Sequence, residues 1–178
     1  MSLAVAGLYL PSRELAHPGH ELTQKIIESK LSREHDPLLA RLLVAAAARH
    51  LPTFRPDLVV SLPPKPGQGD RFRDVRRELA ARLGAADAGG ALIRTRAIPE
   101  YRRMGAAERL AAAGDSHLAA ASVWGKSVLL IDDVVTTGAQ AADATRALLA
   151  AGAADVRIAC VARTIDPHER SRLTISSL

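Results

Sequence analysis

The sequence predicts an α/β fold with a largely parallel sheet. Three short apolar runs, 57–62, 127–131 and 155–162, are typical of buried strands, and helical patterns separate them. Strands that alternate with helices form βαβ units, whose strands lie parallel in one sheet. The length of 178 residues, with 48% hydrophobic and 24% charged side chains, fits one globular domain with a substantial core.

The first fifty residues are expected to supply one strand and two helices. Residues 2–8 are apolar and suit a strand. Leucine and isoleucine side chains at helical spacing predict a helix over 20–30. Asp36 is placed to cap a second helix whose first residue is Pro37, and an apolar stripe extends this helix to about Arg49.

The remaining segments connect the three apolar strands. Proline and glycine make 63–70 a loop. An amphipathic pattern predicts a helix over 73–83, and a short strand follows over 91–96. Residues 99–113 are rich in arginine and weakly helical. A further helix is expected over 138–150, between the second and third apolar strands.

The most informative stretch is 128–140, VLLIDDVVTTGAQ. An apolar strand leads into Asp132 and Asp133, and a turn with two threonines and Gly138 opens the next helix. Backbone N–H groups at a helix N-terminus, with hydroxyl groups beside them, form a cradle for a phosphate dianion. Carboxylates accept hydrogen bonds from ribose hydroxyls, and a divalent cation is compatible with them. The string therefore predicts a sugar-phosphate site.

Each part of this string has a structural alternative. Two aspartates can end a strand, and Thr136 or Thr137 can cap a helix without binding a ligand. These features are common singly, whereas the complete ordered string is far less common, which favours the binding site. No Gly-Lys-Ser/Thr sequence is present in the turn, so it is not a Walker-type loop.

The net charge of +5 is concentrated in the middle of the chain. Residues 51–114 contain 12 basic and 7 acidic side chains, and the rest of the chain contains 12 of each. A local positive field favours an anionic partner, either a polyphosphate ligand or nucleic acid. Solvated helix faces are an equal alternative for Arg76, Arg77 and Arg82.

Cysteine usage and hydropathy exclude other classes. The single cysteine, Cys160, cannot form an internal disulfide, and no Cys/His cluster has the spacing of a zinc site. We expect Cys160 in the core and the protein in the reducing cytoplasm. No apolar run reaches the 18 residues of a membrane span, so no membrane partner is expected. His117 is expected to be structural rather than a proton shuttle.

The string 128–140 resembles the phosphoribosyl diphosphate (PRPP) signature of type I phosphoribosyltransferases. Over 51–163 the chain is similar to the ComF-like (competence-associated) group, with LVVSLPPKP, an Arg/Phe-containing helix start, an R-x-R segment and DDVVTTG in that order. The resemblance implies a parallel five-stranded sheet flanked by helices in a single domain over 1–178, with a small hood contributed by roughly 92–120. It also implies Mg²⁺-bound PRPP, whose pyrophosphate a nitrogen nucleophile displaces from C1 with inversion.

The resemblance further implies a role for individual residues. Asp132 and Asp133 match the acids that hold the ribose hydroxyls, favour an oxocarbenium-like transition state and meet Mg²⁺ indirectly, through PRPP or water. The 5′-phosphate loop matches Thr136, Thr137, Gly138, Ala139 and Gln140. Pyrophosphate binding is implied for Ser61, Leu62, Lys65, Arg96 and Arg102. An exposed position without a ligand is the alternative for Lys65 and for each arginine.

The chain departs from the ComF-like pattern beside the implied site. The usual arginine–glycine–phenylalanine–asparagine–glutamine run corresponds here to 70–74, DRFRD. Tyr101 stands where a glutamine is usual, and 110–115 lack an expected asparagine. These differences leave the acceptor and turnover open. Thr136 stands where hypoxanthine–guanine enzymes have a third acid, and no N-terminal cysteine supplies the nucleophile of a glutamine amidotransferase.

Three functions are compatible with these features. The first is a Mg²⁺-dependent phosphoribosyltransferase that transfers the 5-phosphoribosyl group of PRPP to an unidentified nitrogen acceptor, such as a nucleobase, and releases pyrophosphate. The second is a non-catalytic PRPP-sensing or DNA-uptake accessory protein on the same scaffold. A nucleic-acid binder is the weakest, because only 3% of residues are aromatic and no binding motif is present. The resemblance also implies a homodimer.

Overall fold

The computed structural model describes residues 2–9, 20–32, 37–64, 67–96 and 105–164. Its main sheet has five strands in the order β1-β7-β6-β2-β3, and every neighbouring pair is parallel. The strands are β1 (Leu3–Tyr9), β2 (Leu58–Ser61), β3 (Ala86–Asp87), β6 (Ser127–Val135) and β7 (Asp155–Thr164). This arrangement confirms the predicted α/β class and the largely parallel five-stranded sheet.

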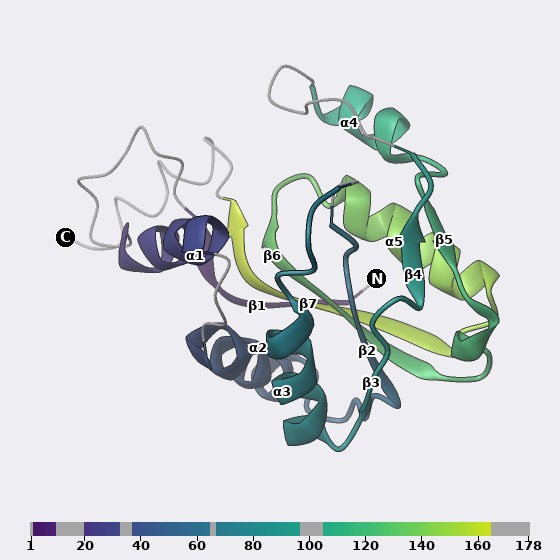
Figure 1. The fold of residues 1–178 in the computed structure, drawn as a ribbon, viewed down its shortest axis with the longest axis horizontal. Coiled ribbons are helices and arrows are strands. Elements are labelled where there is room, and N and C mark those ends of the chain that lie inside the picture. Colours follow the sequence, from purple (N-terminus) through teal and green to yellow (C-terminus); the bar gives the residue numbers. More distant parts are fainter. Residues whose placement is uncertain (1, 10–19, 33–36, 65–66, 97–104, 165–178) are drawn as a thin grey trace.

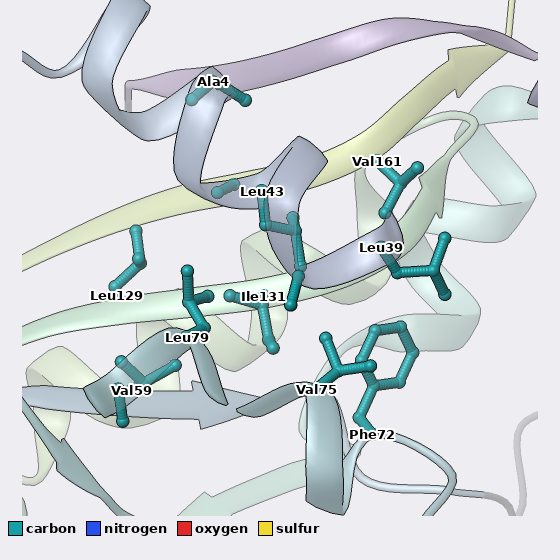
Figure 2. Close-up of a cluster of buried hydrophobic side chains, with 14 of the residues drawn as sticks. Ala4, Leu39, Leu43, Val59, Phe72, Val75, Leu79, Leu129, Ile131 and Val161 are labelled. Carbon is teal, nitrogen blue, oxygen red and sulfur yellow. The ribbon is translucent and has the colours of Figure 1, made fainter. Parts of the chain in front are cut away.

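Helices cover both faces of the sheet (Figure 1). On one face lie α1 (His20–Ser32), α2 (Pro37–His50) and α3 (Arg73–Leu83), and on the other lies α5 (Ala139–Ala150). Figure 2 shows the first of these interfaces, where Leu39 and Leu43 of α2 and Leu79 of α3 pack over Leu129 and Ile131 of β6. Burial of these apolar surfaces holds the central strands in place beneath the cleft described below.

A small second unit lies beside α5 (Figure 1). Its two strands, β4 (Leu92–Arg94) and β5 (His117–Ala119), pair antiparallel, and α4 (Ala106–Ala113) precedes β5. A short 3₁₀ helix (Ala121–Val123) leads from β5 back to the main sheet. Buried Leu92 and Val123 pack in the same apolar cluster as α5, so this unit is attached to the α5 face of the sheet.

The observed elements differ from the predicted ones at informative places. Strand β6 does not end at Ile131 as predicted but continues through Val135, because β7 runs alongside and pairs Asp132 with Cys160 and Val134 with Ala162. Strands β3 and β5, of two and three residues, were not predicted. Only 106–113 of the expected weak helix at 99–113 is helical among the described residues.

Two other expectations concern the core and the membrane. Cys160 is fully buried in β7, as expected, and burial together with the nearby Asp132 charge raises the pKa of its thiol to about 12. Within the described ranges, no helix combines the length and the apolar character needed to cross a bilayer.

Candidate functional site

Strand β6 places two acids at the carboxyl edge of the sheet. Asp132 and Asp133 lie near the end of this strand, and α5 begins a short turn later at Ala139. Strand β2 pairs with β6 up to Ser61, opposite Ile131, so the loop after β2 starts beside the acids. A cleft of about 800 Å³ opens here, at the edge where parallel sheets bind ligands.

The cleft has walls from four segments. They are the loop that follows β2, the segment that enters α3, strand β4, and the end of β6 with its turn into α5. Acidic, basic and hydroxyl side chains therefore face one space although they are far apart in the sequence. Such convergence of polar groups in a concave site is typical of small-molecule binding sites.

The turn between β6 and α5 begins the helix on a left-handed glycine. Gly138 has a φ of 74°, a left-handed conformation that favours glycine. The first helical hydrogen bond runs from Ala142 N–H to the Gly138 carbonyl at 2.8 Å. The N–H groups of the residues before Ala142 therefore lie at the positive end of α5, where Ala139, Gln140 and Ala141 line the cleft.

The two acids are held by backbone N–H groups of their own strand. Asp132 Oδ1 accepts the Asp133 N–H at 2.8 Å, and Asp133 Oδ1 accepts the Val134 N–H at 2.7 Å. Burial and the adjacent Asp133 charge raise the pKa of Asp132 well above its ordinary value. Adjacent carboxylates in one cleft are stable only with compensating positive groups or hydroxyl donors nearby.

Arg71 supplies positive charge to this acid pair. Its Nη2 lies 2.5 Å from Asp133 Oδ2, and the Asp133 side chain is only 8% exposed. The Arg71 guanidinium also lies over the Phe72 ring, with its Cζ 5.0 Å from the ring centroid. Arg71 and Phe72 both line the cleft. A residue of the DRFRD departure is therefore in direct contact with an acid of the site.

Arg94 of β4 bridges the two loops of the cleft. Its Nη2 donates to the Pro63 carbonyl at 3.2 Å and to Gln140 Oε1 at 2.8 Å. Pro63 belongs to the loop after β2, and Gln140 to the first turn of α5. The guanidinium thus connects the implied pyrophosphate loop with the implied 5′-phosphate loop.

Arg76 contacts the start of the loop after β2 on the side away from the cleft. Its guanidinium is buried, contacts Asp87 through Nε, and donates from Nη1 to Ser61 Oγ at 2.8 Å and to Asp70 Oδ2 at 2.7 Å. A Cβ at Gly89 would overlap the Arg76 guanidinium, so a side chain at this position would force the buried guanidinium to move. These contacts give Arg76 a structural role, whereas exposed Arg77 and Arg82 form ion pairs with Asp74 and Glu78, respectively, on the surface of α3.

A buried carboxylate joins α5 to the small unit. Asp143 of α5 accepts hydrogen bonds from the backbone N–H groups of Asp115, Ser116 and His117, from Ser116 Oγ, and from His117 Nδ1 at 2.9 Å. Arg146 also donates to it. Burial alone would raise the pKa of Asp143, but the hydrogen bonds from His117, Arg146 and Ser116 lower it to about 2.

His117 lies at the base of the small unit and does not line the cleft. It is fully buried, and burial lowers its pKa below the ordinary value despite the bond to Asp143. Its Nε2 has no hydrogen-bond partner among the residues that the structure describes. This environment favours a neutral imidazole with a structural role.

The structure brings most of the implied site residues together. The cleft is lined by Leu62, Asp132, Asp133, Thr136, Thr137, Gly138, Ala139 and Gln140. Ser61 instead turns its hydroxyl toward Arg76 behind the loop. Arg96 donates to the carbonyls of Ala112 and Gly114, at the end of α4. Lys65 and Arg102, and also Tyr101, lie outside the described residues.

Three residues of the site area were not singled out from the sequence. Arg71 was identified only as part of the DRFRD departure, Arg94 was one of the hood arginines but was not favoured over Arg96 and Arg102, and Asp143 was given no role. An acid in the otherwise apolar pattern of α5 is the one local signal for Asp143. The partners of all three come from other segments, so local sequence patterns carry no signal for these contacts.

A comparison with protein families agrees with this geometry. The family model described as "Phosphoribosyl transferase domain" matches residues 78–176, which is more than half of the chain and includes the acid pair and the turn. No curated protein matches the sequence.

Several solved structures are similar to this chain. Phosphoribosylpyrophosphate synthetase from Mycobacterium smegmatis is 25% identical over 74% of this chain and 35% of that chain, with a TM-score of 0.44. Adenine phosphoribosyltransferase from Saccharomyces cerevisiae is 19% identical over 77% and 75%, with a TM-score of 0.47. The enzyme from Leishmania tarentolae is 16% identical over 89% and 91%, with a TM-score of 0.46.

This chain spans only about a third of the synthetase chain. The family assignment therefore depends on the matched model, which covers the strand, the acid pair and the turn that form the cleft. By this match, the chain belongs to the phosphoribosyl transferase domain family.

Proposed function

We propose that this protein binds PRPP in the cleft and transfers its 5-phosphoribosyl group to a nitrogen nucleophile, with release of pyrophosphate. The observation that carries the proposal is the position of Asp132 and Asp133 beside the N-terminal turn of α5 in one cleft. A ligand with a phosphate at one end and a vicinal diol in the middle matches these two features.

In this proposal each group of the cleft has a defined task. The turn 136–140 holds the 5′-phosphate with N–H and hydroxyl donors. The carboxylates of Asp132 and Asp133 accept hydrogen bonds from the ribose hydroxyls and stabilise positive charge that develops at C1. The loop after β2, with Leu62 and Lys65, is proposed to face the pyrophosphate. Ser61 supports that loop through Arg76, because its hydroxyl faces the guanidinium.

The reaction exchanges one bond at C1 for another. The nitrogen lone pair forms the new N–C1 bond while the C1–O bond to pyrophosphate breaks and its electron pair leaves with pyrophosphate. The nitrogen then loses its proton. Positive groups near the leaving group lower the barrier, and Arg71 and Arg94 are the described cleft arginines with contacts to its loops or acids.

The donor set of the cleft is compatible with Mg²⁺ bound together with PRPP. Among the described residues, no group of three or more His, Cys, Asp or Glu side chains is placed to hold a metal by itself. Two adjacent carboxylates suit a cation that keeps several waters and takes its other ligands from substrate phosphates. Asp132 and Asp133 would hold Mg²⁺ through water or through PRPP, and the ion would neutralise charge on the pyrophosphate.

The small unit of β4, α4 and β5 is proposed as the hood, over roughly 92–120. Arg96 and Arg102 are proposed to reach pyrophosphate from this unit; for Arg96 this requires release from the carbonyls of Ala112 and Gly114. Membership of the ComF-like group, a homodimer, a single domain over 1–178 and a cytoplasmic location complete the proposal. They rest on the sequence resemblance and on the single cysteine.

Calorimetric titration with PRPP, with and without Mg²⁺, tests the proposal. We expect saturable binding heat, with a larger heat or a lower dissociation constant when Mg²⁺ is present. The double variant Asp132→Asn/Asp133→Asn should lose binding but little thermal stability, because these side chains face the cleft. Glu28→Gln is the matched control, since in the described part of the chain Glu28 forms its ion pair with Lys25 on the exposed face of α1. Absence of heat at millimolar PRPP in the parent protein would reject the proposal.

A non-catalytic PRPP sensor is the second candidate. It is favoured by the DRFRD segment, which departs from the ComF-like pattern and places Arg71 on Asp133. Incubation of labelled PRPP with a library of nitrogen bases separates the two functions. Release of pyrophosphate with any base supports transfer, whereas intact PRPP despite measurable binding supports the sensor.

A further inference from the structure

Asp133 has one carboxylate oxygen directed into its own strand and one directed at Arg71. Oδ1 accepts the Val134 N–H at 2.7 Å, whereas Oδ2 accepts the Arg71 guanidinium at 2.5 Å. A sugar hydroxyl that donates to Asp133 from the cleft therefore meets Oδ2, the oxygen that Arg71 uses. Arg71 lines the same cleft, so a diol that docks on Oδ2 and the guanidinium crowd one oxygen.

The two partners of this ion pair differ in their freedom to move. Asp133 belongs to a central strand and its side chain is 8% exposed, whereas Arg71 lies just before α3 and its side chain is 34% exposed. Turning Arg71 away costs a few side-chain rotations, but moving Asp133 would disturb the sheet. When a hydroxyl docks on Oδ2, Arg71 is therefore the partner that gives way more easily.

A displaced guanidinium needs another anion in the cleft. Asp70, the acid that precedes Arg71 in the sequence, already accepts the Arg76 guanidinium and the Phe72 N–H. PRPP brings its own anion, the diphosphate on C1, which is attached to the same ribose ring as the diol. Guanidinium groups bind phosphate oxygens with paired charge-assisted hydrogen bonds, so the diphosphate replaces the lost carboxylate contact.

We propose that Arg71 is a specificity-determining residue that exchanges Asp133 for the diphosphate of the ligand, and so favours PRPP over ribose 5-phosphate. This inference rests on the proposed function and deepens it. Ribose 5-phosphate has the same 5′-phosphate and diol, so it also displaces Arg71. It offers no diphosphate in return, and the protein therefore discriminates against it.

The exchange predicts opposite effects of one substitution on two ligands. In Arg71→Ala, PRPP loses a charge-assisted contact and its dissociation constant should rise at least about tenfold. Ribose 5-phosphate no longer competes with the guanidinium, so its dissociation constant should fall, by about threefold or more. Calorimetric titration of both ligands in the same Mg²⁺ buffer measures the two changes.

Matched variants separate the exchange from simpler effects. Arg82→Ala removes the same charge from an arginine that pairs with Glu78 on the surface of α3, and should leave both constants unchanged. Arg71→Gln keeps most of the side-chain length and replaces Arg71→Ala if that variant unfolds at a lower temperature. It should likewise raise the dissociation constant of PRPP and lower that of ribose 5-phosphate. A parallel change for both ligands, or no change for either, would overturn the exchange.

The test also separates this inference from the proposed function. If the parent protein does not bind PRPP, the proposed function fails and the exchange fails with it. If the parent protein binds PRPP but Arg71→Ala and Arg71→Gln weaken both ligands by the same factor, only the exchange is wrong, and Arg71 contributes a general positive field.

Discussion

Arg76 and Arg77 are neighbours on α3 with opposite environments. The Arg76 side chain is 4% exposed and contacts Asp70, Asp87 and Ser61, whereas the Arg77 side chain is 65% exposed and only reaches Asp87 at 3.6 Å and Asp74 at 4.0 Å from solvent. From the sequence, both were equally well interpreted as solvated helix residues. The difference arises because the α3 face that carries Arg76 turns toward β2 and β3, which no local pattern shows.

Asp143 is the residue whose charge state we expect to matter most for stability. Its folded-state pKa of about 2 lies below the unfolded value of about 3.9, so its stabilising effect is complete above about pH 4 and is lost as the pH falls toward 2. We expect Asp143→Asn to lower the free energy of unfolding by about 2 kcal/mol at pH 6, and by progressively less at lower pH.

Urea unfolding at pH 6, 4 and 2.5 checks this expectation. Asp155→Asn is the control, because Asp155 is 40% exposed and its ion pair with Arg157 is worth little in solvent. A difference between parent and Asp143→Asn that stays constant from pH 6 to 2.5 would show that the lost contacts are not those of the ionised carboxylate.

At the scale of elements, the turn into α5 depends on one backbone conformation. Gly138 and Gly105 both precede helices, but Gly138 has a φ of 74° and Gly105 a φ of −68°. An alanine Cβ at 138 has room, since the nearest atom is Val135 Cγ1 at 3.8 Å. Any penalty of that substitution therefore comes from backbone strain rather than from a clash.

We expect Gly138→Ala to destabilise the protein by about 1 kcal/mol and to weaken PRPP binding, because the strained turn shifts the N–H groups that are proposed to hold the 5′-phosphate. Gly105→Ala is the matched control and should change thermal stability little. Thermal unfolding and calorimetric titration of both variants measure the two effects. Equal stability of the two variants would mean that the turn tolerates a side chain in its left-handed conformation.

The long, strongly patterned elements were predictable from the sequence. The helix over Arg73–Leu83 has the predicted bounds, and the apolar runs correspond to β2, β6 and β7. Strand β3 was missed because its two residues are alanine and aspartate, and β5 because its three residues lie between alanine-rich segments. Short strands form only because a longer partner is present, and a local pattern does not show that partner.

The same division applies to the site. The string 128–140 predicted the acid pair and the turn, because all of its parts are adjacent in the sequence. It could not predict that Arg71 contacts Asp133, or that Arg94 contacts Gln140, because 62 and 46 residues separate these partners. Basic residues were expected around the anion, but their positions required the fold.

At the scale of the whole molecule, two units that differ in burial meet at the cleft. The central strands β6 and β7 are buried on both faces, whereas β4 and β5 form a two-stranded sheet on which Ile93 and Leu118 are 54% and 58% exposed. A two-stranded sheet is marginally stable alone and depends on its attachment to the rest of the protein. Here that attachment includes Asp143 and Arg94.

Hydrogen exchange should show whether the main sheet and the two-stranded unit differ in local stability. We expect amides of Ser127–Val135 and Asp155–Thr164 to be the most protected, and amides of Leu92–Arg94 and His117–Ala119 to exchange faster, because local opening needs less buried surface there. Exchange followed by mass spectrometry measures both groups in one experiment. Equal protection would show that the two units open only together.

The Arg94 bridge has a geometrical consequence for the cleft. One nitrogen, Nη2, holds the Pro63 carbonyl and the Gln140 side chain at the same time, so the distance between the two loops is fixed by a single planar group. The loops cannot separate without breaking one of these hydrogen bonds. Arg94 therefore sets the separation of the two loops, and a molecule that touches both loops has to match this separation.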